Sequence, residues 1–422
     1  MLKYCELAPG VGLWHFPDDR FKQGCISLQI VRPMGREEAA KNALLPAVLL
    51  RGTEKYPDLR KIAMHLDDLY GADVGAMVRR VGDYQTTGFA CSFIEDRFTI
   101  GGEGVLRPVT EFLGELLRHP LTEGGAFLPE IVAGEKQNLI DAIEAQKNDK
   151  RLYAANQLLR ILCREDAFGI PRLGDREQAE AITAQSLYDH YEKILRESRI
   201  DCFYVGSAGQ EQVAALLMPL FSGISRDYRA LPPHTPLISE PVEDTYELMD
   251  VAQGKLCMGF TTPIALEQPQ SVAMRVCNVI LGGGMSSKLF SEVREKQSLC
   301  YDIGSAYYGM KGIVTVSAGI DRDKEQQVRR AVCRQVEAMA KGEITDAELD
   351  FGKKALLNSV RGIHDAPGSI ENYYATGALS GVIRMPEDYR REILSVTAEQ
   401  VAEAAKTLRL QTVYFLMGVE KC

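Results

Sequence analysis

The residue types that bind metals are scarce and scattered along this chain. Its 422 residues include six histidines, at positions 15, 65, 119, 190, 234 and 364. Even the closest two, His190 and His234, are too far apart to share one face of one helix, so neither HExxH nor HxxEH occurs. The ten cysteines form no CxxC pair, which excludes zinc-ribbon and thioredoxin-like sites. The sequence therefore predicts no zinc site of these kinds.

A run of three glycines, Gly282 to Gly284, is the other feature that could suggest chemistry. It lacks both the preceding strand and the Gly-Lys-Ser/Thr ending of a phosphate-binding loop. We expect it to end a helix at Leu281 and to turn tightly, with Ser286 or Ser287 capping the next helix.

Hydrophobic periodicity predicts strands and helices in an order that favours an α+β fold. Alternation of Ile26, Leu28 and Ile30 indicates a strand with one buried face. The predicted strands cover 25–32, 86–93 and 312–320, and the predicted helices cover 38–50, 58–69, 105–118, 130–147, 271–281, 324–341 and 346–361. Residues 361–372, which contain two glycines and a proline, are expected to form a loop. Neighbouring strands and paired helices indicate helices packed on a mainly antiparallel sheet.

Two similar segments, about half the chain apart, indicate a duplication. Thr183 and Thr397 each precede a helical stretch and are placed to accept from the free N–H groups of its first turn. Gln400 completes a capping box with Thr397. Each stretch is followed by a short apolar strand ending in glycine, 202–206 and 413–418, so the repeat is one large unit rather than a solenoid.

The duplication predicts an N-terminal domain at 1–225 and a C-terminal domain at 245–422. Between them, residues 226–244 contain Pro232, Pro233, Pro236 and Pro241 without a helical period. This composition is typical of an extended linker, and a long surface loop is the alternative.

Several motifs then resemble one family. Residues 281–290 (LGGGMSSKLF), 293–296 (VREK) and 299–301 (LCY) are similar to the C-terminal-domain signature of the insulinase/pitrilysin family of zinc metallopeptidases, in the branch of the mitochondrial processing peptidase. Residues 20–22 (RFK), 51–54 (RGTE) and 69–72 (LYGA) match its N-terminal domain in order. The resemblance covers nearly the whole chain and implies two similar α+β halves that face each other as a clamshell.

The chain departs from this family where the zinc chemistry sits. In the family's HxxEH motif, two histidines bind zinc and the glutamate acts as general base. Counting back from Gly52-Thr53, the histidine positions fall on Ala43 and Ala47 and the glutamate position on Pro46. The third ligand falls on Ala142, with Glu144 close enough to be an alternative. The resemblance therefore implies a degenerate metal site, no catalytic residue and no bound metal in this chain.

The resemblance also assigns a role to Arg294 and Tyr301. In active relatives such a pair comes from the half or subunit without zinc and binds substrate. A guanidinium and a phenol are both hydrogen-bond donors, which suits a substrate carbonyl or a developing oxyanion. Without the motif, Arg294 would be assigned to a solvated helix face and Tyr301 to a strand.

Composition excludes other classes of function. Hydrophobic residues make up 45% and charged residues 25%, and 49 basic against 58 acidic residues give a net charge of −9. This balance is unfavourable for binding nucleic acid or an anionic membrane. A mean hydropathy of −0.14 and the lack of a long apolar run argue against a membrane span. With no export signal recognised and cysteines that look like buried thiols, we expect a cytoplasmic location.

The sequence thus supports two hypotheses. In the first, the chain is the non-catalytic subunit or homologue of a two-chain zinc metallopeptidase, in which a zinc-bearing relative is the partner, zinc resides only in that partner, and extended peptides are the substrate. In the second, it is a self-dimeric peptide-binding or assembly protein without a role in proteolysis, since the same fold serves as non-enzymatic core subunits of respiratory complexes. A new activity centred on Cys300 finds no further support, because a buried thiol is the simpler interpretation.

Overall fold

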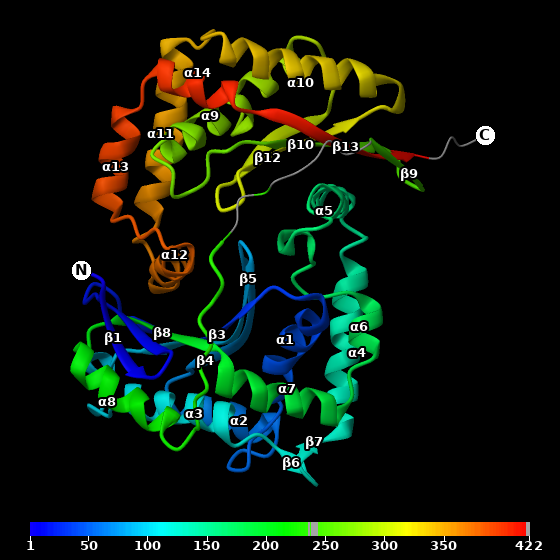
Figure 1. Ribbon diagram of the computed structural model, residues 1–422. Helices are drawn as coiled ribbons and strands as arrows, with labels where there is room; N and C mark the ends of the chain where they lie inside the picture. Colours follow the sequence, from blue (N-terminus) through cyan, green and yellow to red (C-terminus); the bar gives the residue numbers. More distant parts are fainter. Residues whose placement is uncertain (235–236, 238–243, 419–422) are drawn as a thin grey trace. The chain divides into compact units, whose positions relative to one another are not determined.

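The computed structural model describes residues 1–234, 237 and 244–418 (Figure 1). These residues form two compact units, each assembled from non-contiguous segments. The first unit contains residues 1–144, 170–233 and 364–379, and the second contains the described residues of 145–169, 234–363 and 380–422. The predicted domains at 1–225 and 245–422 follow the repeat in the sequence, whereas these units are defined by contacts in space. The predicted bounds therefore remain a prediction. Residues 226–234 form neither helix nor strand, and Pro236 and Pro241 lie outside the described residues.

The sheet of the first unit has six strands in the order β1-β2-β8-β3-β5-β4, and only β2 and β8 pair in parallel. Its strands are β1 (Lys3–Ala8), β2 (Val11–Pro17), β3 (Gln23–Pro33), β4 (Asp73–Val81), β5 (Tyr84–Ile94) and β8 (Arg199–Gly206). The helices of this unit are α1 (Arg36–Leu49), α2 (Leu59–Asp68), α3 (Leu106–Arg118), α4 (Pro129–Ala145), α6 (Arg176–Glu180), α7 (Ala184–Glu197), α8 (Gln210–Phe221) and α12 (Pro367–Ser380). A two-stranded hairpin, β6 (Thr122–Glu123) and β7 (Ala126–Phe127), and a 3₁₀ turn, η1 (Asp96–Phe98), complete it.

The sheet of the second unit has the order β11-β12-β10-β13-β9, and only β13 and β9 pair in parallel. Its strands are β9 (Thr245–Met249), β10 (Gly254–Thr261), β11 (Asp302–Tyr308), β12 (Ile313–Ile320) and β13 (Arg409–Gly418). Its helices are α5 (Lys150–Leu162), α9 (Ser271–Gly282), α10 (Glu325–Ala340), α11 (Asp346–Gly362), α13 (Pro386–Ser395) and α14 (Ala398–Lys406), with a π-helical turn η3 (Leu289–Glu295) and 3₁₀ turns η2 (Ala167–Gly169) and η4 (Arg322–Lys324).

Apart from the extra β1, the two sheets share one strand order and one parallel pair. This confirms the α+β class, the mainly antiparallel sheets and the two related halves. The predicted caps are present too. Thr183 Oγ1 accepts from the Ser186 N–H at 3.1 Å, and Thr397 Oγ1 accepts from the Gln400 N–H at 3.3 Å. The structure adds that Ser186 Oγ accepts from the Thr183 N–H, so both copies carry a capping box.

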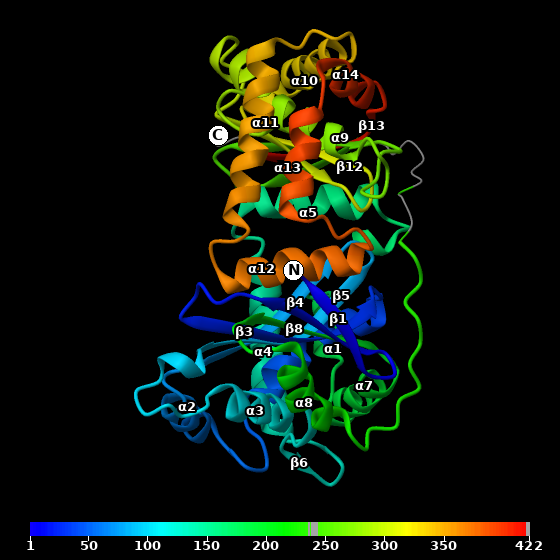
Figure 2. The ribbon, with the colours of Figure 1, turned by 90° about the vertical axis from the view of Figure 1, so that its left-hand side faces the viewer.

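The prediction that β3 has one buried face was wrong, because both faces are buried. Ile26, Leu28 and Ile30 belong to the main core of the unit. Ser27 and Gln29 on the opposite face are also inaccessible, because α12 covers them (Figure 2). The expected loop at 361–372 is present but shorter, covering 363–366. Helix α11 continues to Gly362, and α12 begins at Pro367, a favourable first residue of a helix.

Glu371 of α12 joins this helix to the sheet. Its buried carboxylate accepts from Ser27 Oγ at 2.7 Å and Gln29 Nε2 at 2.6 Å, and it pairs with Arg79 at 3.0 Å. A buried charge is costly unless it is paired and hydrogen-bonded, so these donors make the docked position of α12 specific.

The second unit is layered in the same way. Figure 1 shows α9, α10 and α14 on one face of its sheet and α5 on the other. Helix α5 packs on β10 and β13, with Ala154 and Leu158 in one cluster with Cys257, Tyr414 and Leu416. After α5, Asp166 pairs with the fully buried Lys311 at 2.9 Å. Within the described residues, no helix is long and apolar enough to cross a membrane.

The glycine run ends a helix, as predicted, one residue later than expected. Helix α9 ends at Gly282, and Gly284 has φ +150°, a conformation that L side chains rarely adopt. The predicted serine cap is not formed at η3, whose N-cap position is Lys288, although Ser287 Oγ accepts from the Phe290 N–H at 3.4 Å.

Gly282 also lets α9 approach β11 closely, because a Cβ there would lie 2.6 Å from the Ser305 nitrogen. Ser305 Oγ donates to the Asn278 carbonyl at 3.0 Å across the same contact.

Replacing Gly282→Ala is therefore expected to destabilise the protein by about 1–3 kcal/mol through overpacking. The matched control is Gly134→Ala in α4, where a Cβ would meet nothing within 4 Å. That change should stabilise by roughly 0.5–1 kcal/mol through helix propensity. Urea unfolding of both variants measures the difference, and equal effects at the two positions would show that the α9–β11 approach is not tight.

Candidate functional site

The positions to which the family resemblance assigns the zinc motif, Ala43, Pro46 and Ala47, lie on α1. Ala43 and Pro46 are buried and Ala47 is half-buried. The helix begins after Gly35 without a side-chain cap. Glu37 and Glu38 in its first turn interact favourably with the positive end of the helix dipole. The sequence thus forms a regular helix here, with methyl groups and a proline ring at the three positions.

Pro46 inside α1 requires compensation. A proline has no N–H, so the carbonyl of Asn42, four residues earlier, loses its helical partner. Thr87 of β5 supplies the missing donor, because its hydroxyl donates to the Asn42 carbonyl at 2.6 Å. Both residues are inaccessible to solvent, so this bond replaces a backbone bond in the core.

The side chain of Asn42 belongs to a buried polar network. Its Nδ2 donates to Gln85 Oε1 at 2.9 Å, and its Oδ1 lies 2.7 Å from His190 Nε2 of α7. Gln85 Nε2 in turn donates to the Ala39 carbonyl at 3.0 Å. The network connects α1 to β5 and α7. It uses the buried polar groups of this helix in hydrogen bonds within the core.

These residues do not fit a zinc ion. Alanine and proline side chains carry no donor atom, Ala142 of α4 is exposed, and Glu144 pairs with Arg176. The buried carboxylate of α4 is Glu135, which pairs with Arg51 just after α1. Among the described residues, no group of three or more histidines, cysteines or carboxylates could hold a metal ion. We therefore assign no zinc-dependent step to this chain.

Arg294 lies in η3, and π-helical turns are rare and often found at functional sites. Its guanidinium carbon lies 4.5 Å from the Phe290 ring centre, and its Nε is 3.6 Å from Glu295. The side chain is 39% exposed, so the charged group is held over an aromatic ring and still meets solvent.

The chain after η3 turns sharply before it reaches Tyr301. Ser298 has φ +51°, and its N–H donates to the Arg294 carbonyl at 3.1 Å. Just before β11, Cys300 is buried in the core and Tyr301 is 58% exposed. The buried Cys300 has its pKa raised to about 11 by desolvation, as expected for an inert thiol.

The Tyr301 hydroxyl donates to Asp321 at 3.0 Å, and Asp321 pairs with Lys324 at 2.9 Å. The hydrogen bond to the Asp321 carboxylate raises the pKa of Tyr301, so its phenol keeps its proton at neutral pH. Arg294 and Tyr301 thus share one turn of the chain and both reach solvent. Among the described residues, no hydrogen bond joins the two side chains.

Sequence reasoning did not find the polar groups that tertiary contacts bring together. Asn42, Gln85 and His190 come from three separate elements and carry no motif. A second cluster, around Arg32, Lys193 and Arg229, is equally dispersed. The available signal was the pair of arginines at 226 and 229, at the start of the proline-rich segment.

The role of Thr87 can be tested with a double-mutant cycle. Thr87→Val should cost about 1–3 kcal/mol, because it leaves the buried Asn42 carbonyl unpaired. In a Pro46→Ala background the new backbone N–H can donate to that carbonyl, so the same Thr87→Val change should cost less. Urea unfolding of the four proteins measures the coupling, and costs that add within about 0.5 kcal/mol would contradict it.

The buried His190 predicts a pH dependence of stability. Desolvation, opposed by Glu38 and reinforced by Lys41, Arg32 and Lys193, lowers the pKa of His190 from 6.5 to about 4. The unfolded chain therefore binds more protons between these values, and the free energy of unfolding decreases as the pH falls through that range. From about pH 7 to about pH 4.5 this group should account for a loss of about 2 to 3 kcal/mol.

The readout is the pH dependence of chemical unfolding for the wild type and for His190→Gln, which should lack this loss. His119→Gln, at a half-exposed histidine, serves as the matched control and should keep it. If the free energy of unfolding depends on pH in the same way in all three proteins, His190 is not the source of the loss of stability.

Known proteins resemble this chain in both sequence and fold. A family profile described as "Peptidase M16 inactive domain" matches residues 181–356. "Probable inactive metalloprotease YmfF" of Bacillus subtilis is 29% identical over 402 residues, which are 95% of this chain and 94% of that protein. A conserved protein from Enterococcus faecalis V583 is 28% identical, and its crystal structure superposes with a TM-score of 0.92 over 100% of this chain and 99% of that chain.

Two more distant structures share the fold alone. A peptidase M16 inactive domain from Pseudomonas fluorescens is 18% identical with a TM-score of 0.80, over 100% of this chain and 98% of that chain. A chain of complex III2 from Candida albicans is 14% identical with a TM-score of 0.75, over 99% of this chain and 95% of that chain. The chain is thus similar to members of the M16 peptidase family that are described as inactive, and this is the insulinase/pitrilysin-like family that its motifs resemble.

Proposed function

We propose that this protein is the non-catalytic subunit of a two-chain zinc metallopeptidase, with zinc held by a partner that carries HxxEH. The observation that carries the proposal is a contrast between two places in the chain. On α1, Ala43, Pro46 and Ala47 provide no ligand or base. On the turn from η3 to β11, Arg294 and Tyr301 remain as exposed donors on the family's motif.

The two donors suit a substrate carbonyl or an oxyanion formed at the partner's site. Phe290 restricts the guanidinium of Arg294, whose planar fork of N–H donors matches a carbonyl or an oxyanion. Tyr301 keeps its proton, and its hydroxyl would exchange Asp321 for a substrate oxygen. Such donors stabilise charge that develops in the transition state.

An extended peptide is the substrate class that the neighbouring strand favours. Tyr301 directly precedes β11, which is an outer strand of its sheet. An outer strand offers backbone groups to a peptide that adds as a further strand, so main-chain hydrogen bonds supply affinity. Arg294 and Tyr301 would then lie at the beginning of this peptide-binding edge.

The second candidate is a peptide-binding or assembly protein that takes no part in proteolysis and forms a dimer with itself. A chain of complex III2 from Candida albicans has the same fold, which makes a role in assembly compatible with this architecture. A self-dimer that binds peptides and yields no activity with any zinc-bearing relative would favour this candidate.

Activity with a partner tests the first proposal. The purified chain alone should hold no stoichiometric zinc and cleave no peptide. Co-expressed with a zinc-bearing relative from the same cell, it should give activity whose kcat falls about 10²-fold or more in Arg294→Ala, the usual loss for one oxyanion donor. Tyr301→Phe, which removes only the hydroxyl, should lower kcat in the same assay.

Arg330→Ala on the exposed face of α10 is the matched control and should leave the rate unchanged. Partial recovery in Arg294→Lys would show that positive charge matters. Peptidase activity of the chain alone would contradict the non-catalytic assignment. Full activity of Arg294→Ala in the complex would remove the proposed role of this residue.

A further inference from the structure

A cavity of about 250 Å³ opens beside the end of β3 in the first unit. Three stretches of the first unit line it, namely residues 31–33 of β3, the last turn of α7 at 193–198, and residues 229–231 of the segment that follows α8. Since a water occupies roughly 30 Å³ and drug-sized sites begin at about 300 Å³, the volume suits a small ligand.

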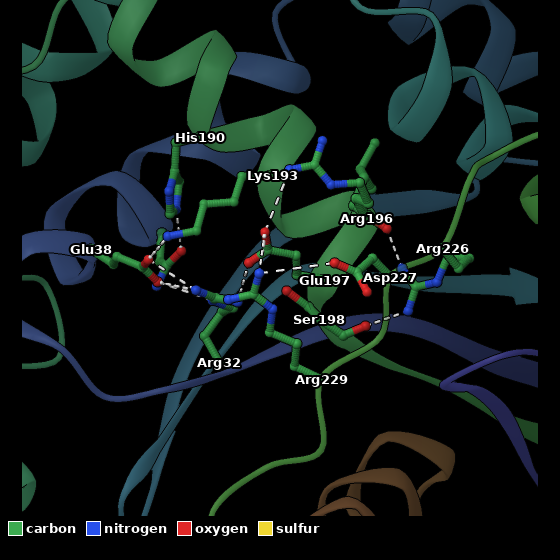
Figure 3. Close-up of polar contacts among 12 residues, drawn as sticks. Arg32, Glu38, His190, Lys193, Arg196, Glu197, Ser198, Arg226, Asp227 and Arg229 are labelled. Atoms are coloured by element: carbon green, nitrogen blue, oxygen red, sulfur yellow. Dashed lines mark hydrogen bonds and ion pairs between the residues drawn. The ribbon is translucent and has the colours of Figure 1, made fainter.

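The lining carries a surplus of positive charge, although the whole chain is acidic. Arg32, Lys193 and Arg229 are three cations against the single carboxylate of Glu197 (Figure 3). Glu38, behind the cavity, pairs with Arg32 at 2.8 Å and with Lys193 at 2.6 Å. Asp227, 3.9 Å from Arg229, is a third carboxylate, and Arg196, 3.4 Å from Glu197, is a fourth cation, so the group keeps one positive charge in excess.

The cations are only partly satisfied by these carboxylates. Arg32 donates to Glu38 through Nε and Nη2. Within the described part of the chain, the one carboxylate near its Nη1 is Glu197, at 3.9 Å. Arg229 lies 3.4 Å from Glu197 and 3.9 Å from Asp227. Ordinary N–H···O bonds are about 2.7–3.2 Å long, so both guanidinium groups have N–H groups left for another acceptor.

The adjoining end of α7 does not repel an anion, because its carbonyls are already paired. Arg226 donates to the carbonyls of Leu195 and Ser198. The backbone N–H groups of Asp227 and Arg229 donate to the carbonyls of Arg196 and Glu197, each at 3.0 Å. These bonds satisfy the orphan carbonyls that give a helix C-terminus its negative character.

Ser198 provides the independent observation. It lines the cavity, is only 2% exposed, and its hydroxyl has no hydrogen-bond partner among the described residues. In Figure 3 this hydroxyl lies on the side of the Arg32 and Arg229 guanidinium groups, away from Arg226. A buried hydroxyl without a partner is costly and points to a missing acceptor. A water would satisfy the hydroxyl but would leave the charge surplus uncompensated.

We propose that this cavity binds a small dianion of the phosphate class, either inorganic phosphate or a phosphate monoester. Arg32 Nη1, the Arg229 guanidinium and the Ser198 hydroxyl would donate to its oxygens, with Lys193 adding charge. Guanidinium forks match phosphate geometry, which favours this class over a single carboxylate.

The floor of the cavity distinguishes the two sources. Val31 and Leu231 line it and pack with Tyr84 and Leu379 in one apolar cluster. This floor can take the apolar group of a monoester. Because Arg229 and Leu231 belong to the segment that follows α8, a bound phosphate would also tie that segment to β3 and α7.

Isothermal titration calorimetry of the full chain at constant ionic strength tests the proposal, with inorganic phosphate, phenyl phosphate and succinate as probes. Phosphate should bind at one site. Ser198→Ala and Arg229→Gln should each weaken it by about tenfold or more, as expected for a lost hydrogen bond to a charged group. Ser198→Ala removes only an unpaired hydroxyl, so the unliganded variant should unfold no more easily than the wild type.

Arg330→Gln on α10 removes the same charge elsewhere and should leave the affinity unchanged. Tighter binding of phenyl phosphate would identify a monoester as the ligand, and equal or weaker binding would identify the free ion. The proposal is overturned if phosphate does not bind, if succinate binds equally well, or if Ser198→Ala and Arg229→Gln keep the wild-type affinity.

Discussion

Each sheet of this protein must bury both of its faces, and the second face is covered by a helix that the chain supplies from its other half. Helix α12 covers the sheet of the first unit, and α5 covers the sheet of the second. Each exchanged segment also brings a carboxylate to a mostly buried cation, Glu371 to Arg79 and Asp166 to Lys311. An uncompensated buried charge is strongly destabilising, so these pairs make each docking position specific.

Helix α1 depends on this layered arrangement. It packs against β5, and β5 is where Thr87 and Gln85 meet the Asn42 carbonyl and side chain. The proline at position 46 is tolerated because a side chain from the sheet replaces the backbone donor that it removes. The polar groups of α1, Asn42 above all, are thus used in packing.

The groups proposed to bind ligands are mainly cationic side chains, although the chain as a whole is acidic. Arg294 projects from a π-helical turn, and Arg32, Lys193 and Arg229 surround a cavity in the other unit. The net charge of the whole chain reveals neither group of cations, because it sums charges on residues that are far apart in the fold. Local surplus charge beside an unpaired hydroxyl is more informative about a ligand than the overall balance.

The sequence by itself determined the α+β class, the duplication and the helix caps, because these depend on periodicity and on local spacing, as at Thr183 and Thr397. The replacement of metal ligands at Ala43 and Ala47, and of the base at Pro46, is what the resemblance to the family implies. Only the tertiary structure decided that Ser27 and Gln29 are buried, that residues 367–372 are helical, and that Arg229 lines one cavity with Arg32 and Ser198. Those outcomes depend on contacts between residues far apart in the chain, where burial and the pairing of charges outweigh local propensity.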